Sequence, residues 1–552
     1  MKRARRMLLS LPVRIGGRKG VSSPKWVGSS LDRKPSRRSS ASDPSGPRHV
    51  TVAGTSYSAL GPGEDLPPDG SSVVRQTAMK RRYWRVSALA SLVLFGALTS
   101  ARDAEASGYL TARFGTDHGT PSQPNTFAVY YNPAALGGTK GTTITGDLSV
   151  MLRVARYNRT QDALSPSNDS LLADQSYVDA NTGTATLTNL LALPFFGVNT
   201  DFGTRNFRAG YAAYIPFGGL ATWDRVRGVP GSPGSTDGVQ RWHNISGQIL
   251  AIYNTFAAAY RFESLKLTVG ASVSPIIHDV ATVRARNPNG SDDTVTNGTL
   301  QEGRSFLHAT GVNLGATLGL YFEPTEKLRF GLSYISQPGF GETRMSGTLR
   351  TQLGAGQQSK ADIDFLQEYP DIIRFGAGWR ATERFEVRGD FEFVRWSVFE
   401  RQCVVNPGTD CNVASDGRRL ANGNNVQLNV PRNWNDAIGL RAGPGYWFTD
   451  RLEGFGSLGM TTPAVPKETI DASTMDAFRL YLTVGAKYDI SKHFSIAGSY
   501  NHIYFFTVNT NGVNNQNLAG RGDEYIVSRS PSADGRYRSQ IGFVNVNAAY
   551  TF

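Results

Sequence analysis

A strict two-residue alternation of polar and apolar side chains runs through most of this 552-residue chain. In the segment 385–393 the odd positions are apolar or small, and the even positions are all charged: Glu386, Arg388, Asp390 and Glu392. Successive side chains of a β-strand point to opposite faces, so this segment has one apolar and one charged face. Four charges on one face do not belong in an apolar core, so we expect the charged face to line a polar, enclosed interior.

The same rhythm recurs in the segments 312–322, 478–488 and 544–552. A soluble β-sandwich also alternates, so the period alone does not identify the fold. Aromatic residues gather at the ends of the alternating segments, as in the girdles of a barrel at the two membrane interfaces. These aromatics are Phe207, Phe217, Trp379, Tyr446, Trp447, Phe448, Tyr504, Phe505 and Phe506.

The segments are joined by alternately short and long connections, and we predict fourteen strands. They span 143–158, 187–199, 206–220, 243–261, 265–285, 305–322, 327–350, 369–380, 384–400, 432–448, 451–461, 477–489, 493–509 and 536–552. Long connections are expected at 159–186, 221–242, 286–304, 351–368, 401–431, 462–476 and 510–535. Lipid offers no hydrogen-bond partners, so strands cross it only in a closed barrel. The sequence therefore predicts an all-β, 14-stranded antiparallel transmembrane barrel over residues 143–552, with its short turns in the periplasm.

A barrel also explains the length, because soluble single cores stop growing at roughly 250 to 300 residues. The formal charge of +13 suggests a negatively charged partner, but residues 107–552 carry 39 basic and 38 acidic side chains. We therefore expect no nucleic-acid partner.

The basic surplus lies in the first 106 residues. Residues 1–78 are rich in Arg, Ser, Pro and Gly, which favours disorder, and we interpret them as an extension before the true start at Met79. Residues 79–106 have the basic start, short apolar run and small-residue cleavage site of a signal peptide. An internal signal anchor is the alternative, although this 13-residue run is shorter than the roughly 20 residues that a spanning helix needs.

The stretch "FAVYYNPAALGG", Phe127 to Gly138, precedes the first strand and is too broken for a regular element. An even strand count puts both barrel ends in the periplasm, so we expect residues 107–142 to enter the lumen as a plug, or hatch. "AVYYNPAAL", with Asn132, Pro133 and Ala134, resembles the hatch motif of the FadL/TodX family of long-chain fatty-acid transporters. Similar stretches include "AAYIPFGGLATW" and "PDIIRFGAGWRATERFEVRGDFEFVRWSVF".

This resemblance implies a barrel plugged by a hatch, with passive uptake of hydrophobic compounds such as long-chain fatty acids. It also implies a shift of the hatch and lateral exit of the cargo through a gap at the third strand. Pro216, followed by Gly218 and Gly219, independently favours a break in pairing there. The alternative is that Pro216 marks the rim of the barrel.

Ligand-contact candidates are the apolar hatch residues and one basic side chain of a polar face: Leu110, Phe114, Phe127, Val129, Tyr130, Leu136 and Arg388. The hatch residues could equally serve only to pack the plug against the wall, and Arg388 could belong to an ion-pair network. Cys403 and Cys411, in the predicted loop 401–431, are expected to form a disulfide in an oxidising compartment.

No catalytic motif, metal-binding motif or cofactor motif is evident, so we expect neither an enzyme nor a cofactor. The predicted location is the outer membrane of a Gram-negative bacterium, with a hydrophobic small molecule and membrane lipid as partners. A monomer is expected, inserted by the barrel-assembly machinery through the C-terminal strand that ends in Phe552. A general diffusion porin and a surface adhesin or receptor remain the alternatives.

Overall fold

The computed structural model describes residues 113–518 and 520–552. The predicted N-terminal extension, the predicted signal peptide and Leu110 lie outside the described residues. Within them, no helix is long and apolar enough to cross a membrane.

Fourteen antiparallel strands of the described chain form a closed barrel, as predicted. β1 pairs with β2 along its full length and with β21 on its other edge, which closes the wall. The strands, some of which consist of two consecutive pieces, are β1 (Thr142–Arg159), β2 (Gly183–Thr200), β3 (Phe207–Thr222), β4 (Ser246–Phe262), β5 (Leu267–Arg286), β8 (Gly303–Thr325), β9 (Leu328–Ile335) with β10 (Thr343–Gln352), β11 (Ser359–Gln367) with β12 (Ile372–Arg380), β13 (Phe385–Val394) with β14 (Arg401–Val405), β15 (Val426–Pro431) with β16 (Ala437–Trp447), β17 (Leu452–Thr461), β18 (Arg479–Asp489), β19 (Phe494–Phe505) and β21 (Arg536–Thr551).

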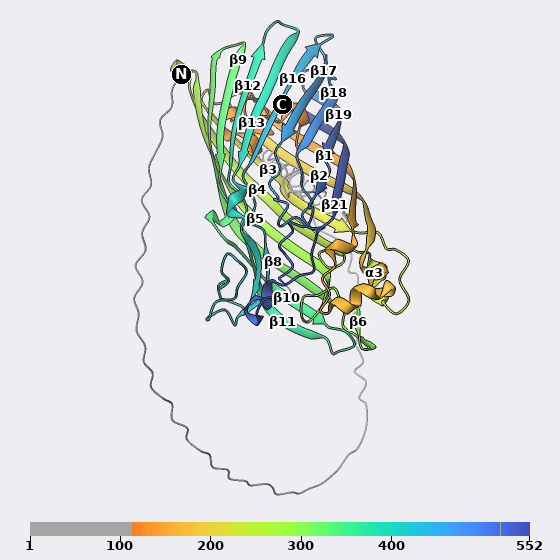
Figure 1. The fold of residues 1–552 in the computed structure, drawn as a ribbon. Helices are drawn as coiled ribbons and strands as arrows, with labels where there is room; N and C mark the ends of the chain where they lie inside the picture. Colours follow the sequence, from red (N-terminus) through yellow and green to blue (C-terminus); the bar gives the residue numbers. More distant parts are fainter. Residues whose placement is uncertain (1–112, 519) are drawn as a thin grey trace, which may run out of the picture. The chain divides into compact units, whose positions relative to one another are not determined.

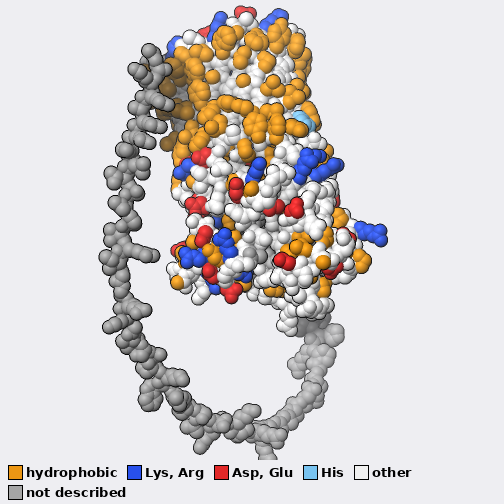
Figure 2. Space-filling view, viewed as in Figure 1, with side chains coloured by type: hydrophobic (Ala, Val, Ile, Leu, Met, Phe, Trp, Pro, Cys, Tyr) orange, Lys and Arg blue, Asp and Glu red, His pale blue; other side chains and the backbone are white. Residues whose placement is uncertain are grey.

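The apolar half of each two-residue repeat faces outward. Leu318 on β8, Val484 on β18 and Val546 on β21 are 61%, 51% and 56% exposed, respectively. Figure 2 shows these outward side chains as a broad apolar band over the part of the barrel near the tight turns, while the other part consists mainly of uncharged polar side chains and backbone with charged side chains scattered among them. An exposed apolar band bordered by aromatic side chains is the surface that a bilayer covers.

The two ends of the barrel differ in the length of their connections. Figure 1 shows the C-terminus toward the end with the tight turns, while α3 (Gln175–Asn181) and the β6–β7 hairpin (Val295–Thr296 and Thr299–Leu300) lie in the loops of the other end. The predicted long connection 351–368 is wrong, because β10 and β11 pair and turn within 353–358. β14 and β15 likewise occupy the ends of the predicted loop 401–431. These pieces extend the wall beyond the apolar band, where the alternation that the bilayer imposes no longer applies.

The polar half of the repeat faces the lumen, and its charges are paired there. In β13, Glu386 contacts Arg388 and Arg329, and Glu392 contacts Arg374. The four charges of segment 385–393 thus line an enclosed interior, as predicted.

Three of the predicted girdle aromatics do not face the membrane. Phe217 and Phe505 are 2% and 4% exposed on the lumen side, and Trp447 lies on the lumen face of β16, next to the Arg388 guanidinium. A register shift between Tyr214 and Phe217 reverses the alternation in β3, which turns Phe217 inward.

Candidate functional site

The hatch is a short irregular segment whose centre is fixed by one buried amide. It contains η1 (Thr116–His118), α2 (Ala128–Tyr131) and η2 (Pro133–Gly138). Asn132 caps η2 by accepting a hydrogen bond from the Ala134 N–H (3.2 Å), and Pro133 occupies the first position of η2, where no N–H is needed. The Asn132 Nδ2 donates to the carbonyl of Pro121 in the hatch (2.8 Å) and to the carbonyl of Leu320 in β8 (2.9 Å).

Glycines of the wall allow this motif to approach the barrel backbone. A Cβ on Gly319 of β8 would lie 2.0 Å from the Asn132 Oδ1, and one on Gly270 of β5 would lie 2.3 Å from the Ala134 nitrogen. A Cβ on Gly331 of β9 would lie 1.9 Å from the Pro121 carbonyl oxygen. The glycines of these three neighbouring strands therefore leave space for the hatch backbone, and a larger residue would fill it. We call these three positions the glycine seat.

Lumen charges hold the rest of the hatch. Arg441 of β16 donates to the carbonyls of Thr116 (3.0 Å) and Gly119 (3.1 Å) and pairs with Asp117 (3.2 Å). Arg374 of β12 donates to the Tyr130 hydroxyl (2.7 Å), and its guanidinium lies 4.4 Å from the centre of that ring. The hatch is thus bound by buried polar contacts as well as by packing.

Most of the predicted ligand-contact residues pack the hatch against the wall. Phe114 and Phe127 lie against the ring of Phe195, at 5.4 and 5.0 Å between centroids. Val129 and Leu136 surround Gly210 of β3. Arg388 donates to Glu386 (2.9 Å) and pairs with Glu453, which also contacts His118 of the hatch (3.0 Å).

The wall is incomplete between β2 and β3. These strands pair only from Phe195↔Tyr214 to Thr200↔Ala209, although each continues toward the loop end. The pairing of β3 with β4 also skips Ile215 and Pro216. We call the unpaired stretch between residues 183–194 and 215–222 the seam.

The seam coincides with a change in how β3 is buried. Residues 212–219 are all buried, so this part of the strand has lost the inward and outward alternation that the other strands retain. Pro216 lacks an N–H and cannot donate a ladder hydrogen bond, and Gly218 and Gly219 follow it. Across the seam, the Asn189 side chain donates to the Leu220 carbonyl (3.0 Å).

Two cavities border this kinked stretch. The inner one, of about 10 Å³, is next to the hatch and is lined by Tyr130, Pro216, Phe217 and Ser274, among others. This volume holds about one water molecule. The outer one, of about 80 Å³, lies toward the loop end and is lined in part by Gly219. Tyr130, Pro216 and Gly219 are the predicted site residues that line these cavities.

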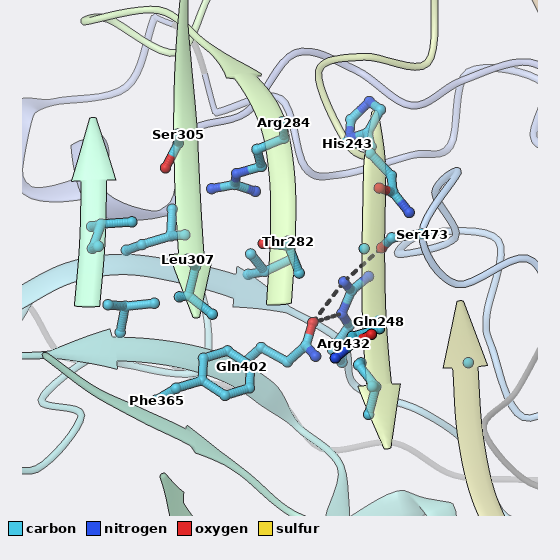
Figure 3. Close-up of a pocket in the computed structure, with 18 residues that line it drawn as sticks. His243, Gln248, Thr282, Arg284, Ser305, Leu307, Phe365, Gln402, Arg432 and Ser473 are labelled. Atoms are coloured by element: carbon cyan, nitrogen blue, oxygen red, sulfur yellow. Dashed lines mark hydrogen bonds between the residues drawn. The ribbon is translucent and has the colours of Figure 1, made fainter. Parts of the chain in front are cut away.

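The outer cavity has an apolar part and a polar part. Leu307, Phe365, Val404 and Leu428 belong to one apolar cluster and line one part. The polar part contains His243, Arg284, Gln402, Arg432 and Ser473. Figure 3 shows Arg284 projecting from β5, with Leu307 on the neighbouring strand β8 and Phe365 lower in the view.

Some polar groups of this cavity have hydrogen-bond or ion-pair partners, and others do not. Arg432 donates to Gln402 (2.8 Å) and to Asp471 (2.8 Å). Burial opposes ionisation of Asp471, but the adjacent Arg432 keeps its pKa below the usual range. The Arg284 guanidinium, in contrast, makes no ion pair or hydrogen bond with another described residue. The His243 Nε2 is buried without a partner, and burial lowers the pKa of His243 to about 4, so this ring is neutral at pH 7.

A barrier of aromatic rings separates the two cavities. On the lumen face of β5, His278 lies between Ser274 of the inner cavity and Thr282 of the outer one. Its ring centroid lies 5.1 Å from that of Tyr369, which lies 5.4 Å from that of Phe217. All three side chains are buried, and the two cavities share no lining residue.

The predicted cysteine pair forms a disulfide in the structure. Its position differs from the prediction, because Cys403 lies in β14 and only Cys411 lies in the loop. Among the residues that the structure describes, no group of three or more His, Cys, Asp or Glu side chains could hold a metal ion.

Sequence reasoning missed the outer cavity. Arg284 is on the lumen face of β5 by parity, but nothing in its local pattern distinguishes it from lumen arginines that have partners. Arg284 differs from them in that no acidic residue lies opposite it on the facing strand. That difference can be seen only once the pairing register of the two strands is known.

A family model described as outer membrane protein transport protein (OMPP1/FadL/TodX) matches residues 97–552. Similar solved structures include a Pseudomonas aeruginosa FadL homologue with 15% identity and a TM-score of 0.60, over 82% of this chain and 99% of that chain. The Pseudomonas putida toluene transporter TodX has 15% identity and a TM-score of 0.54, over 80% and 99%. The Ralstonia pickettii toluene transporter TbuX has 16% identity and a TM-score of 0.52, over 81% and 99%. At these identities the likeness shows the fold. No curated protein sequence matches this chain.

Proposed function

Because the chain belongs to the OMPP1/FadL/TodX family of outer membrane transport proteins, we propose that it takes up long-chain fatty acids passively and releases them sideways through the seam. The family is one of membrane transport channels, and its place is the Gram-negative outer membrane. The observation that carries the lateral route is the loss of β2–β3 pairing beside Pro216, next to both cavities.

The two-part outer cavity supports an amphiphilic cargo. A fatty acid would place its carboxylate at the unpaired Arg284 and its chain against the cluster around Leu307 and Phe365. A charge-assisted hydrogen bond to a guanidinium is about twice as strong as a neutral one. Each methylene that leaves water contributes about 0.8 kcal/mol, so capture needs no energy source.

Transport through this site requires a rearrangement. The inner cavity is too small for a hydrocarbon chain, and the rings of Phe217, Tyr369 and His278 lie between the two cavities. Movement of the hatch would draw Tyr130 away from the inner cavity and open space beside the seam. Exit into the membrane would spare the cargo a passage through water.

Two of the similar structures are toluene transporters, so a neutral aromatic hydrocarbon is the second candidate cargo. A guanidinium can attract the ring of such a molecule by a cation–π contact, but this leaves its N–H donors without acceptors and is weaker than a charged hydrogen bond to a carboxylate. The cavity therefore favours an acid.

The seam is tested by replacing Gly218 with leucine, because a Cβ there would lie 3.1 Å from the Ile215 side chain in the kink. We expect fatty-acid uptake to fall at least tenfold in a host that lacks its own channel. Gly146→Leu is the matched control, since Gly146 faces outward in β1 with open space around it. Heat-modifiable gel mobility would confirm that both variants fold. Normal uptake by a folded Gly218→Leu protein would exclude the seam as the exit.

A further inference from the structure

A pair of arginines occupies opposite positions on the outer surface of the barrel. Arg156 of β1 and Arg538 of β21 are direct partners in the strand ladder, and both are exposed. Directly opposed residues of neighbouring strands have their Cβ atoms about 5 Å apart, and like charges in such a pair are destabilising. Within the described part of the chain, neither guanidinium forms an ion pair or a hydrogen bond.

The surrounding outer face does not neutralise these charges. On β21 the flanking outward residues are Gln540 and the basic Arg536, and the neighbour of Arg156 across β2 is Thr186. The Thr186 hydroxyl donates to the carboxylate of Asp224 (2.7 Å), and that carboxylate makes no ion pair with Arg156. An anion from outside the chain would satisfy the pair.

The wall forms a groove at this point. The pairing of β19 with β21 ends at Tyr504↔Gln540 and resumes only at Val508↔Tyr537, in β20 (Val508–Asn509). A groove of about 430 Å³ opens over this interruption. It is lined by both arginines together with Val154, Tyr504, Phe505, Thr507, Ser539 and Gln540.

The groove lies where the membrane ends. Along β1, the outward positions from Ile144 to Val154 carry no charge, and Arg156 is the next outward residue toward the loop end. Ten residues of a strand tilted as in other barrels span about 25 Å of bilayer height, which is the usual height of the apolar band. Figure 2 shows basic side chains grouped just beyond the apolar band on the right of the view, the side where Figure 1 places β1, β19 and β21.

We propose that Arg156 and Arg538 bind a phosphate of lipid A, the phosphorylated glycolipid of the outer leaflet. The loop end faces outward from the cell, so this height is the head-group level of that leaflet. The guanidinium pair would hold the phosphate from two sides, with the amide of Gln540 and the hydroxyl of Thr507 as further donors. Val154 and Tyr504, on the membrane side of the groove, would contact the acyl chains. This site faces the membrane and not the lumen, so it is distinct from both cavities of the transport path, although Arg156 is paired with Thr186 at the edge of the seam.

The test uses protein refolded in detergent without lipopolysaccharide and titrated with purified lipid A, with binding measured by native mass spectrometry. We expect lipid A to bind at least tenfold more tightly than dephosphorylated lipid A or phosphatidylglycerol. Arg156→Gln combined with Arg538→Gln should lose at least tenfold in lipid A affinity. The matched control is Arg451→Gln with Lys492→Gln, which removes two exposed charges from the periplasmic end and should leave lipid A binding unchanged.

A second variant keeps the test informative if the double variant folds poorly. Arg156→Glu places opposite charges in the cross-strand pair, so in detergent it should raise the melting temperature while abolishing lipid A binding. Lipid A should raise the melting temperature of the unaltered protein and of the control, but not that of Arg156→Glu. Equal affinity for dephosphorylated lipid A, equal loss in the control, or unchanged binding by Arg156→Glu would each overturn the proposal.

Discussion

At the scale of single residues, the lumen contains arginines with two different kinds of surroundings. Arg374, Arg388 and Arg441 are buried next to carboxylates and hatch groups, so their charges are used in holding the plug. Arg284 faces a cavity with no partner among the described residues. A buried charge without a partner is costly, and a ligand that supplies the counter-charge recovers that cost.

Replacing Arg284 with glutamine should therefore weaken binding of a fatty acid by about tenfold to a hundredfold, the loss of roughly 1.5 to 3 kcal/mol from a charged hydrogen bond. Binding of the corresponding fatty alcohol should change little, because its head group carries no charge. Competition with a fluorescent fatty acid measures both affinities. Arg350→Gln, an exposed outward position on β10, is the control. Equal losses for acid and alcohol would show that Arg284 does not recognise the carboxylate.

Asn132 is the residue on which the hatch position depends most directly. Asn132→Asp keeps the shape but replaces the Nδ2 donor with an oxygen that faces the carbonyls of Pro121 and Leu320. We expect the docked hatch to be destabilised by a few kcal/mol, since lost buried hydrogen bonds and repulsion between acceptors add together. Limited proteolysis of the hatch should accelerate while the barrel keeps its melting temperature. Asn422→Asp, in an exposed loop, is the control, and equal proteolysis in both variants would contradict this role.

At the scale of elements, β3 differs from every neighbouring strand because proline removes a donor where the wall needs one. Prolines elsewhere interrupt pairing without shifting the register: the pairing of β4 with β5 skips Pro275, the pairing of β16 with β17 skips Pro444, and each resumes in the same register. The difference is position, since Pro216 lies at the place where β2 and β3 already diverge. One missing donor leaves Ile215 and Pro216 unpaired on both sides, and residues 217–219 pair with β4 only.

Pro216→Val should restore an N–H and a residue that favours strands, and so strengthen pairing along the kink. Amide hydrogen exchange over residues 215–219 should slow, and fatty-acid uptake should fall several-fold. Pro275→Val should change neither quantity appreciably. Slower amide exchange with unaltered fatty-acid uptake would show that transport does not depend on the kink.

At the scale of the whole molecule, the hatch and the barrel wall pack together into one continuous set of contacts. The glycine seat, the arginine contacts and the aromatic packing all join residues of the hatch to residues more than 60 positions away. The lumen charges beneath the hatch also pair with one another across the wall, as in Arg388 with Glu453. We therefore expect the barrel to be stable without the hatch, and the hatch to block its lumen.

Deletion of residues 107–141 should consequently leave a folded barrel with an open lumen. In planar bilayers we expect low single-channel conductance for the intact protein and a several-fold increase after the deletion. The physical reason is that the lumen left behind is polar and fills with water. A wide, ohmic pore in the intact protein would instead support the general diffusion porin.

The sequence alone predicted the strands within the apolar band, most of their outward faces and a plug segment before the first strand. Side-chain alternation is a local property of an extended chain, and the bilayer selects which face is apolar, so Val484 and Leu318 could be placed without any partner being known. The hatch and the family could also be predicted from short motifs around Asn132.

Only the tertiary structure decided which polar groups have partners and where the wall opens. The seam depends on where β2 and β3 stop pairing, the inward turn of Phe217 on a register shift, and the free charge of Arg284 on the absence of a facing acid. The opposed arginines at 156 and 538 stand 382 positions apart and meet only because the barrel closes between its first and last strands. These features depend on contacts between segments that are far apart in the sequence. The local alternation of side chains does not determine such contacts.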